Sequence, residues 1–398
     1  MVFNLRSFSF TDSIEDDPPP PPRGFSLKEL RVGTHKFSEE NFLAEGGFGK
    51  VYRGRLADGS LVAVKRARTV DQCSKEQFET EVQVGRSVST HPNVLRLRGF
   101  CRTTKELLLV YPLIINNSLS YNLTERPDRF AQPLNWTTRK RIALGAARGL
   151  AHLHHQGNIK IMHRYICAAS ILLNVQFEAV IGSFCIAMIM HERNVEEGTI
   201  EWRTHTPRHG TGVSLSSPLE ENSADAGFDS QIYHRYEDVY VNTLTCGIIG
   251  FTAPEYSYTG KCTLKNDVFA YGKMLLELIS GQPIFDFFPE VHNGEALWLE
   301  DWVRKHMNEG QLGRVIDPNL QANYVEEEAE RLVQLALLCA HKDPSVRPEM
   351  SEVVEILESQ FLQRDSSTRS SWSPSECEPT TPYYSFPPSP SPPLVIGP

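Results

Sequence analysis

AEGGFGKV at residues 44–51 and VAVK at residues 62–65 are the two segments that decide the fold of this chain. The glycines of the first segment let backbone amides approach a polyphosphate closely. Lys65 ends the strongly β-forming second segment, and Glu81 follows in a stretch that we expect to be a helix. A lysine paired with such a glutamate lies over the α- and β-phosphates of a nucleotide. Glycine-rich turns are common, so this prediction depends on the spacing of all three features.

Around these segments the chain divides into a sheet-rich part and a helical part. From residue 42 to residue 111, short apolar runs alternate with turns, which predicts an antiparallel sheet interrupted by one helix near residues 75–88. Beyond Pro133 apolar residues recur at helical spacing, and residues 268–279 and 329–340 are expected to be buried helices. The sequence therefore predicts an α+β protein with a small β-rich lobe and a larger helical lobe.

Composition sets the expected domain boundaries. Proline and polar residues dominate at residues 1–24 and Ser and Pro at residues 362–398, so we expect both ends to be disordered. The small lobe and its preceding helix should span residues 25–111, and the large lobe residues 112–361. A polar stretch at about residues 191–237 lacks periodicity and is predicted to be an insertion. A misread coding segment is the alternative origin for that stretch.

Charge and cysteine content exclude several classes of function. The formal charge of −9 argues against nucleic acid as the main partner. The eight cysteines form no CxxC pair, so we predict no metal site and expect reduced thiols. The apolar run at residues 180–190 is shorter than the roughly 20 residues of a membrane-spanning helix. We therefore expect a soluble, cytoplasmic protein without a transmembrane segment, recruited to the plasma membrane only through partners.

Five further segments carry a resemblance to a known family: GRLADG at residues 54–59, LVAVKR at 61–66, LRLRGFC at 95–101, LLVYP at 108–112 and TRKRIALG at 138–145. With the two segments above, they resemble the kinase domain of the plant somatic-embryogenesis receptor-like kinases, which are leucine-rich-repeat receptor kinases. The likeness extends from about residue 25 to residue 361 except for the insertion, and it implies a bilobal protein-kinase fold.

The resemblance implies a nucleotide cleft between the lobes. It implies that Tyr111 is the gatekeeper and that the hinge follows it at residues 112–114. It also implies that Val51, Ala63 and Leu172 sandwich an adenine ring. The hinge residues are Tyr111, Pro112, Leu113 and Ile114. The vestigial nucleotide-binding residues are Gly46, Gly47, Gly49, Val51, Ala63, Lys65, Glu81 and Leu172.

The catalytic motifs of that family are altered in this chain. The family pattern H-R-D followed by K-x-x-N becomes HRYICAAS at residues 163–170, and D-F-G becomes SFC at residues 183–185. No catalytic residue is intact, and the degenerate positions are Tyr165, Cys167, Ser170 and Ser183. Cys167 and Cys185 also lie at the mouth of this site, either as a redox-sensitive pair or as inert thiols.

These replacements remove the chemistry of phosphate transfer. A phenol with a pKa near 10, as at Tyr165, is neutral at pH 7 and cannot serve as a ready base. Hydroxyls at Ser170 and Ser183 are poor substitutes for the hard charged oxygens that magnesium prefers. We therefore predict that the magnesium site is lost, and that ATP binds weakly without magnesium or not at all. Glu178 is the only nearby carboxylate that could replace the missing base.

The residues that build the scaffold of the family are retained. They are His163, Arg164, Glu255, Asp267 and Arg347. The resemblance implies that Glu255 and Arg347 form a buried ion pair, and that Asp267 holds the backbone of the catalytic turn. It also suggests that Arg164 receives a phosphorylated residue, Thr243 or Thr245, through charge-assisted hydrogen bonds.

Gly85 is a further departure, because the family has a bulky apolar residue four positions after the glutamate. Glycine costs about 1 kcal/mol relative to alanine inside a helix. We expect Gly85 to leave a gap beside Phe184, a mobile helix, and a weakly held pair between Lys65 and Glu81.

Two functions remain open from the sequence. The missing catalytic groups favour a pseudokinase that binds or regulates receptor-type protein kinases. The retained Lys65, Glu81 and glycine-rich loop leave a weak or atypical ATP-dependent serine/threonine kinase as the alternative.

Overall fold

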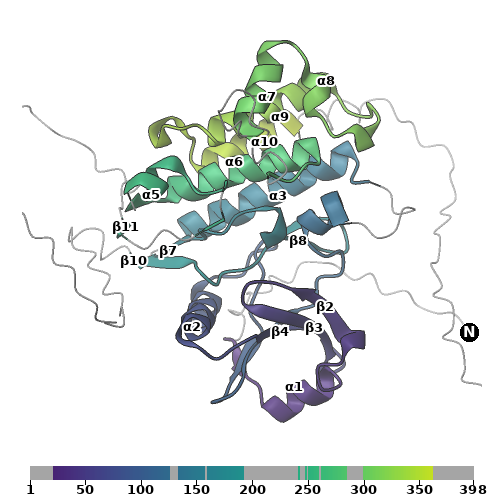
Figure 1. The fold of residues 1–398 in the computed structure, drawn as a ribbon, viewed down its shortest axis with the longest axis vertical. Coiled ribbons are helices and arrows are strands. Elements are labelled where there is room, and N and C mark those ends of the chain that lie inside the picture. The colour runs from purple at the N-terminus through teal and green to yellow at the C-terminus, as the bar shows by residue number, and fades with distance from the viewer. Residues whose placement is uncertain are drawn as a thin grey trace, which may run out of the picture.

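The computed structural model describes residues 21–125, 133–156, 159–191, 241–242, 247–248, 250–259, 261–284 and 299–361. These residues form two lobes, a small one built on a β-sheet and a larger one built mainly of helices (Figure 1). The α+β class and the two-lobed division predicted from the sequence are confirmed.

The small lobe contains a six-stranded sheet in the order β1-β5-β6-β4-β3-β2. Its strands are β1 (Arg23–Gly24), β2 (Phe42–Glu45), β3 (Gly49–Arg55), β4 (Leu61–Ala67), β5 (Gly99–Arg102) and β6 (Leu107–Pro112). All neighbours pair antiparallel except β1, which runs parallel to β5. Because β1 lies within residues 1–24, ordered structure begins earlier than the expected boundary.

The two faces of this sheet pack against different helices. Ser26 is the N-cap of α1 (Leu27–Gly33), and its Oγ atom accepts a hydrogen bond of 3.1 Å from the amide of Glu29. Its Leu30 joins an apolar cluster with Val62 and Val64 on one face. Side chains alternate along a strand, so Lys65 projects from the opposite face. α2 (Gln72–Ser87) packs against β6 on that face.

The large lobe holds the remaining elements. The helices are α3 (Trp136–His155), α5 (Pro254–Thr259), α6 (Leu264–Ser280), α7 (Leu299–Asn308), α8 (Leu312–Val315), α9 (Glu326–Cys339) and α10 (Met350–Phe361). The strands are β7 (Ile159–Met162), β8 (Ile171–Leu173), β9 (Ala179–Ile181), β10 (Met188–His191), β11 (Val241–Asn242) and β12 (Lys261–Cys262). Short helical turns are η1 (Glu39–Asn41), η2 (Tyr121–Glu125), η3 (Ala168–Ser170), η6 (Pro318–Leu320) and η7 (Pro344–Val346).

α6 is the central helix of the large lobe and packs against α3 and α9 (Figure 1). It begins at Thr263 with a capping box and ends at Gly281, whose φ of 68° suits glycine. A Cβ atom on Gly281 would lie 2.2 Å from the Oδ2 atom of Asp317, so only glycine fits there. Asp317 in turn pairs with the fully buried Arg139 of α3. This anchor fixes the two longest helices relative to each other.

The connection between α2 and β5 joins the lobes. Asn93 donates a hydrogen bond of 2.8 Å from Nδ2 to the carbonyl of Ala179, and its own carbonyl accepts one of 2.8 Å from the amide of Ile181. The small lobe is thereby docked on β9.

Two expected segments are largely outside the described residues. The predicted insertion begins at the last residue of β10, and its other residues are not described. The predicted tail at residues 362–398 also lies outside. Among the helices that the structure describes, none has the length and hydropathy needed to cross a membrane.

Candidate functional site

Lys65, Glu81 and Tyr111 form a buried polar triad under the sheet. The Nζ atom of Lys65 on β4 lies 2.5 Å from the Oε1 atom of Glu81 on α2. The hydroxyl of Tyr111, at the end of β6, donates to the Oε2 atom of the same carboxylate. Glu81 is only 2% exposed, so its two oxygens are satisfied inside the protein. Sequence reasoning missed this role of Tyr111, because nothing in its spacing indicates a partner on α2.

Electrostatics reinforce the triad. Burial acts to lower the pKa of the Lys65 ammonium, but the Glu81 carboxylate outweighs burial and raises it above its ordinary value. Burial and the Glu81 charge both raise the pKa of the Tyr111 phenol well above its ordinary value. Lys65 is therefore a cation and Tyr111 a neutral hydrogen-bond donor at neutral pH.

The gap expected at Gly85 beside Phe184 is present as a small cavity lined by Gly85, Leu97 and Phe184. The space directly next to Gly85 is tight, because a Cβ atom there would lie 2.7 Å from the Cβ atom of Leu97 and 2.8 Å from its Cδ2 atom. The pair between Lys65 and Glu81 is formed despite this glycine, whereas the mobility of α2 stays a prediction.

The catalytic turn is held by Asp267 of α6. Its carboxylate accepts hydrogen bonds of 2.7 Å from the backbone amides of His163 and Arg164, and one of 3.0 Å from Nε2 of His154. Burial acts to raise the pKa of Asp267, yet the hydrogen bond and charge of His154 and the proximity of His163 lower it below its ordinary value. The backbone scaffold of this turn is thus complete.

The side chains presented by that turn are poor acid–base groups at neutral pH. Tyr165 is half-buried, and its burial, followed by the proximity of Cys167 and Cys185, raises the pKa of its phenol above 10.0. Burial raises the pKa of Cys167 to about 11. Burial also raises the pKa of Cys185, although Lys65 opposes that effect. These groups are therefore protonated at pH 7.

The Ser170 hydroxyl is used within its own turn. It donates a hydrogen bond of 2.9 Å to the carbonyl of Cys167 and accepts one of 3.1 Å from the amide of the same residue. Ser170 is fully buried, so both contacts are shielded from water. Ser183 is half-buried with a positive φ of 68°. Its neighbour Phe184 packs edge-on against His163, with ring centroids 5.0 Å apart.

No described group of three or more histidine, cysteine, aspartate or glutamate residues has the geometry of a metal site. The family's magnesium ligands would be an aspartate at position 183 and an asparagine at position 170. The serines present there supply neutral hydroxyls, and that of Ser170 is already engaged. The residues present do not fit a magnesium ion.

The apolar residues expected to flank an adenine ring are partly exposed. Val51 on β3, Ala63 on β4 and Leu172 on β8 are each partly exposed, unlike the apolar residues of the core. The hinge residues Pro112, Leu113 and Ile114 follow β6 directly and are also partly exposed. Gly46 and Gly47 lie in the turn between β2 and β3, and Gly49 is the first residue of β3.

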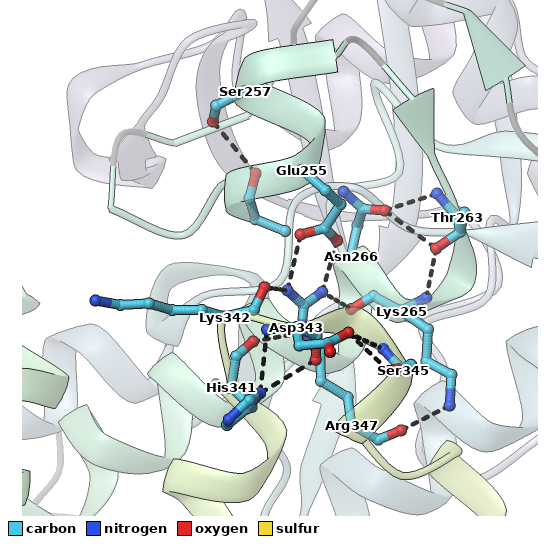
Figure 2. Close-up of polar contacts among 11 residues, drawn as sticks. Glu255, Ser257, Thr263, Lys265, Asn266, His341, Lys342, Asp343, Ser345 and Arg347 are labelled. Carbon is cyan, nitrogen blue, oxygen red and sulfur yellow. Dashed lines mark hydrogen bonds and ion pairs between the residues drawn. The ribbon is translucent and has the colours of Figure 1, made fainter.

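Arg347 and Glu255 form a two-bond ion pair beneath the catalytic turn (Figure 2). The Nη1 and Nη2 atoms of Arg347 lie 2.6 Å and 2.8 Å from the two carboxylate oxygens. The same guanidinium donates to the carbonyls of His341, Lys265 and Lys342. This arginine therefore ties α5 to the N-terminus of α6 and to the segment before α10.

Arg164 is directed toward α5. It donates a hydrogen bond of 2.7 Å from Nη2 to the hydroxyl of Tyr256. Its suggested phosphorylated partners, Thr243 and Thr245, lie outside the described residues.

A β-rich lobe carrying a buried lysine–glutamate pair, stacked on a helical lobe with an aspartate-held turn, is the architecture of a protein kinase domain. Comparison with protein families agrees, because the model described as protein tyrosine and serine/threonine kinase matches residues 37–206 and 220–357. The chain belongs to the protein kinase family. The break in the match falls within the expected insertion.

Several relatives are leucine-rich-repeat receptor kinases. The chain is 41% identical over 340 residues to the rice "LRR receptor kinase SERK2" and 42% identical over 340 residues to the Arabidopsis thaliana "Probable LRR receptor-like serine/threonine-protein kinase At5g10290". Each match covers 85% of this chain and 48% of the relative, so the chain spans about half the length of these relatives. The resemblance inferred from the sequence is confirmed.

Proposed function

We propose that this kinase-family chain is catalytically impaired and that it binds or regulates receptor-type protein kinases. The observation that carries the proposal is that the base position and both metal-ligand positions hold neutral hydroxyl residues in place of the family's side chains. Tyr165 stands where the base belongs, and Ser170 and Ser183 stand where the metal ligands belong.

The magnitude of these losses favours inactivity. A missing general base alone removes roughly 10²–10⁴-fold in rate. Losses within one catalytic unit are not additive, but a vacant base and a vacant metal site together remove both functions on which phosphoryl transfer depends. The raised pKa of Tyr165 adds to the argument, because its phenolate is rare at pH 7.

Loss of the metal ligands also bears on the cofactor. Without magnesium, most of the charge of ATP is not neutralised, and Lys65 is the one cation of the triad in the cleft. We propose that ATP binds weakly and independently of magnesium, or not at all. A thermal shift with ATP that strictly requires magnesium would contradict this.

The experiment that tests catalytic impairment is phosphate incorporation from labelled ATP by the purified chain. A Lys65→Met variant is the background control, and the kinase domain of the rice relative is the positive control. Equal incorporation by wild type and variant, at background, supports the proposal. Incorporation by the wild type that the variant lacks would show that an unidentified residue supplies the base or the metal site.

The second candidate is a weak or atypical serine/threonine kinase. The formed pair between Lys65 and Glu81 favours it, since this pair must be in place for phosphoryl transfer in protein kinases. The same labelling experiment discriminates the two, provided that long incubations and high protein concentrations are included.

The partner class rests on the relatives, which are named as receptor kinases. We propose that the chain acts in the cytoplasm and reaches the plasma membrane by binding such a kinase. Titration against the purified kinase domain of the rice relative tests this. A complex that changes the autophosphorylation rate of that domain supports regulation, and no complex with several such domains would count against the partner class.

A further inference from the structure

α1 presents a basic face to solvent. Leu30 is the buried residue of this helix and packs against the sheet. Lys28, Arg31 and Val32 are exposed, and 70% of the surface of Val32 is accessible to solvent. Residues three and four apart are neighbours on a helix, so these three side chains share one face. The face therefore combines two cations with an apolar side chain that has no cover in the described part of the chain.

The turn after α1 extends this face and has a strained backbone. His35, Lys36 and Phe37 have φ values of 50°, 59° and 57°, in the left-handed region that residues other than glycine rarely adopt. The turn is held by a hydrogen bond of 3.1 Å from the amide of Phe37 to the hydroxyl of Thr34, and by one of 2.6 Å from the amide of Lys36 to the carbonyl of Arg31. Phe37 is thereby buried, whereas Lys36 stays exposed beside the end of α1.

This surface keeps a net positive charge. Glu106 is shared by two arginines, because its carboxylate lies 2.7 Å from Nη2 of Arg66 and 3.8 Å from Nη2 of Arg31. One carboxylate offsets only one of these guanidiniums. Among the described residues, Lys28 and Lys36 have no acidic partner within ion-pair distance. Cations that are left unpaired on a protein surface are available to an anionic partner.

The other carboxylates near α1 are directed elsewhere. Glu29 pairs with Arg23 at 3.0 Å. Glu39 lies 3.8 Å from Nζ of Lys50 on β3. Glu39 and the exposed Glu40 belong to η1, which packs against β3 and not against α1. None of these three carboxylates forms an ion pair with a lysine of the basic face.

The charge of the chain is divided between its two lobes. Residues 21–112 contain 16 Lys and Arg against 10 Asp and Glu, whereas residues 113–398 contain 23 against 35. α1 lies at the end of the small lobe, on the opposite side of the two lobes from α7 and α8 (Figure 1). An anionic surface therefore attracts the α1 end of the molecule and repels the acidic part, which orients the approach.

We infer that the basic face, defined by Lys28, Arg31, Val32 and Lys36, binds the anionic surface of a lipid bilayer. The choice of a bilayer rests on the proposed function, which brings the chain to the plasma membrane, where the cytoplasmic leaflet carries anionic lipids. The cations contact headgroup oxygens, and Val32 lies at the boundary of the acyl chains. This contact is made by the chain itself and adds to its recruitment by a kinase partner.

The expected strength of the contact is modest. Each Lys or Arg near an anionic bilayer contributes about fivefold in affinity. Three cations and one valine therefore give weak, reversible binding, comparable to that of a single membrane signal. A kinase partner at the membrane raises the local concentration of the chain, so the same weak contact then fixes its orientation.

Sedimentation of the full chain with phospholipid vesicles, with no kinase present, tests the inference. Wild type should bind vesicles that contain about 30% phosphatidylserine and not vesicles of phosphatidylcholine alone. Binding at about 0.1 M salt should fall at least about tenfold at about 1 M salt, where the Debye length is about 3 Å. The triple variant Lys28→Gln, Arg31→Gln, Lys36→Asn should lose about 100-fold in affinity. Asparagine is chosen at position 36 because it tolerates the left-handed backbone.

The matched control removes the same charge from the opposite end of the molecule. Arg304, Lys305 and Arg314 are exposed on α7 and α8, and their triple replacement by glutamine should change binding by less than about twofold. Val32→Ser keeps every charge and should weaken binding by about threefold without changing its salt dependence. Melting curves check the fold of each variant. Where the triple variant does not fold, Lys28→Gln and Lys36→Asn alone should each lose about fivefold.

Three results would overturn the inference. Wild type that does not bind anionic vesicles at low salt would refute the bilayer as partner. Equal losses in the two triple variants would show that net charge, and not the basic face, is responsible. Binding to polyglutamate but not to vesicles, lost in the basic-face variant, would assign the face to an acidic protein. None of these measurements involves ATP or a kinase, so their failure leaves the proposed function untouched.

Discussion

Gly85 lies in the interior of α2, where its missing side chain makes room for Leu97. Helix propensity alone predicts that Gly85→Ala stabilises the protein by about 1 kcal/mol. Overpacking against Leu97 costs about 1–3 kcal/mol, so we expect Gly85→Ala to lower the free energy of unfolding by about 0–2 kcal/mol in place of raising it. Denaturant unfolding measures this.

Gly313→Ala in α8 is the control, because no atom lies within 4 Å of the Cβ position there. It should leave the free energy of unfolding unchanged or raise it slightly. If Gly85→Ala stabilises the protein to the same degree, Leu97 can move aside at little cost.

Some features of the site could be predicted from the sequence residue by residue, and others could not. Tyr165 and Ser183 could be recognised from the sequence as replacements of the family's aspartates, because the identity of a side chain does not depend on the fold. The internal use of the Ser170 hydroxyl could not, because a serine gives no sign of which backbone atoms it will meet. The same holds for Phe48, whose burial depends on where α2 is placed.

At the scale of helices, a buried ion pair joins α6 and α7. Lys273 is 1% exposed and pairs with Glu300, and its burial outweighs the nearby carboxylates and lowers the pKa of its ammonium. Lys273→Met leaves Glu300 without its partner and should destabilise the protein by about 3 kcal/mol. The double variant Lys273→Met, Glu300→Leu should have a stability within about 1 kcal/mol of wild type, or a higher one. Thermal melting of wild type, the single variant and the double variant measures both effects.

The exposed pair between Arg148 of α3 and Glu358 of α10 is the control. Arg148→Ala should cost at most about 1 kcal/mol, because solvent screens exposed pairs. Equal effects of Lys273→Met and Arg148→Ala would contradict the importance of burial.

A second charge in α6 predicts a pH dependence. Burial raises the pKa of Glu277 from 4.5 to about 7, while its Oε1 atom accepts a hydrogen bond of 2.9 Å from the amide of Ile284. The folded state therefore holds a proton that the unfolded state releases near pH 4.5. This contribution is favourable below that pH and is lost as the pH rises to about 7, by about 3 kcal/mol.

Unfolding of wild type and Glu277→Gln between pH 5 and 8 measures this effect. The variant keeps the acceptor oxygen for Ile284 but cannot ionise, so its stability should fall less across this range and exceed that of wild type at pH 8. Parallel pH profiles would mean that another group is responsible.

At the scale of the whole molecule, the ion pair between Arg347 and Glu255 connects elements that are far apart in the sequence. Arg347 is 1% exposed and contacts three segments of the large lobe (Figure 2). Arg347→Lys keeps the charge but loses the paired geometry, so we expect a loss of about 3 kcal/mol in unfolding free energy. The exposed Arg314→Lys should change stability by less than about 0.5 kcal/mol. A tolerated lysine at 347 would mean that charge alone suffices.

The two-lobed architecture and the replacement of the family's catalytic side chains could be inferred from the sequence alone. Strand and helix periodicity are local properties, and the ionisable groups of each side chain are fixed by its identity. The pairing of Lys65 with Glu81 joins two elements, and it was predicted from the kinase-like spacing of the glycine-rich segment, the lysine and the glutamate.

The contacts between side chains around the site could be seen only in the tertiary structure. The contacts of Tyr111 with Glu81, of Leu97 with Gly85 and of Phe48 with Lys65 join different elements. Such contacts depend on how α2 packs against the sheet, and that packing is the sum of many weak interactions that no local pattern encodes.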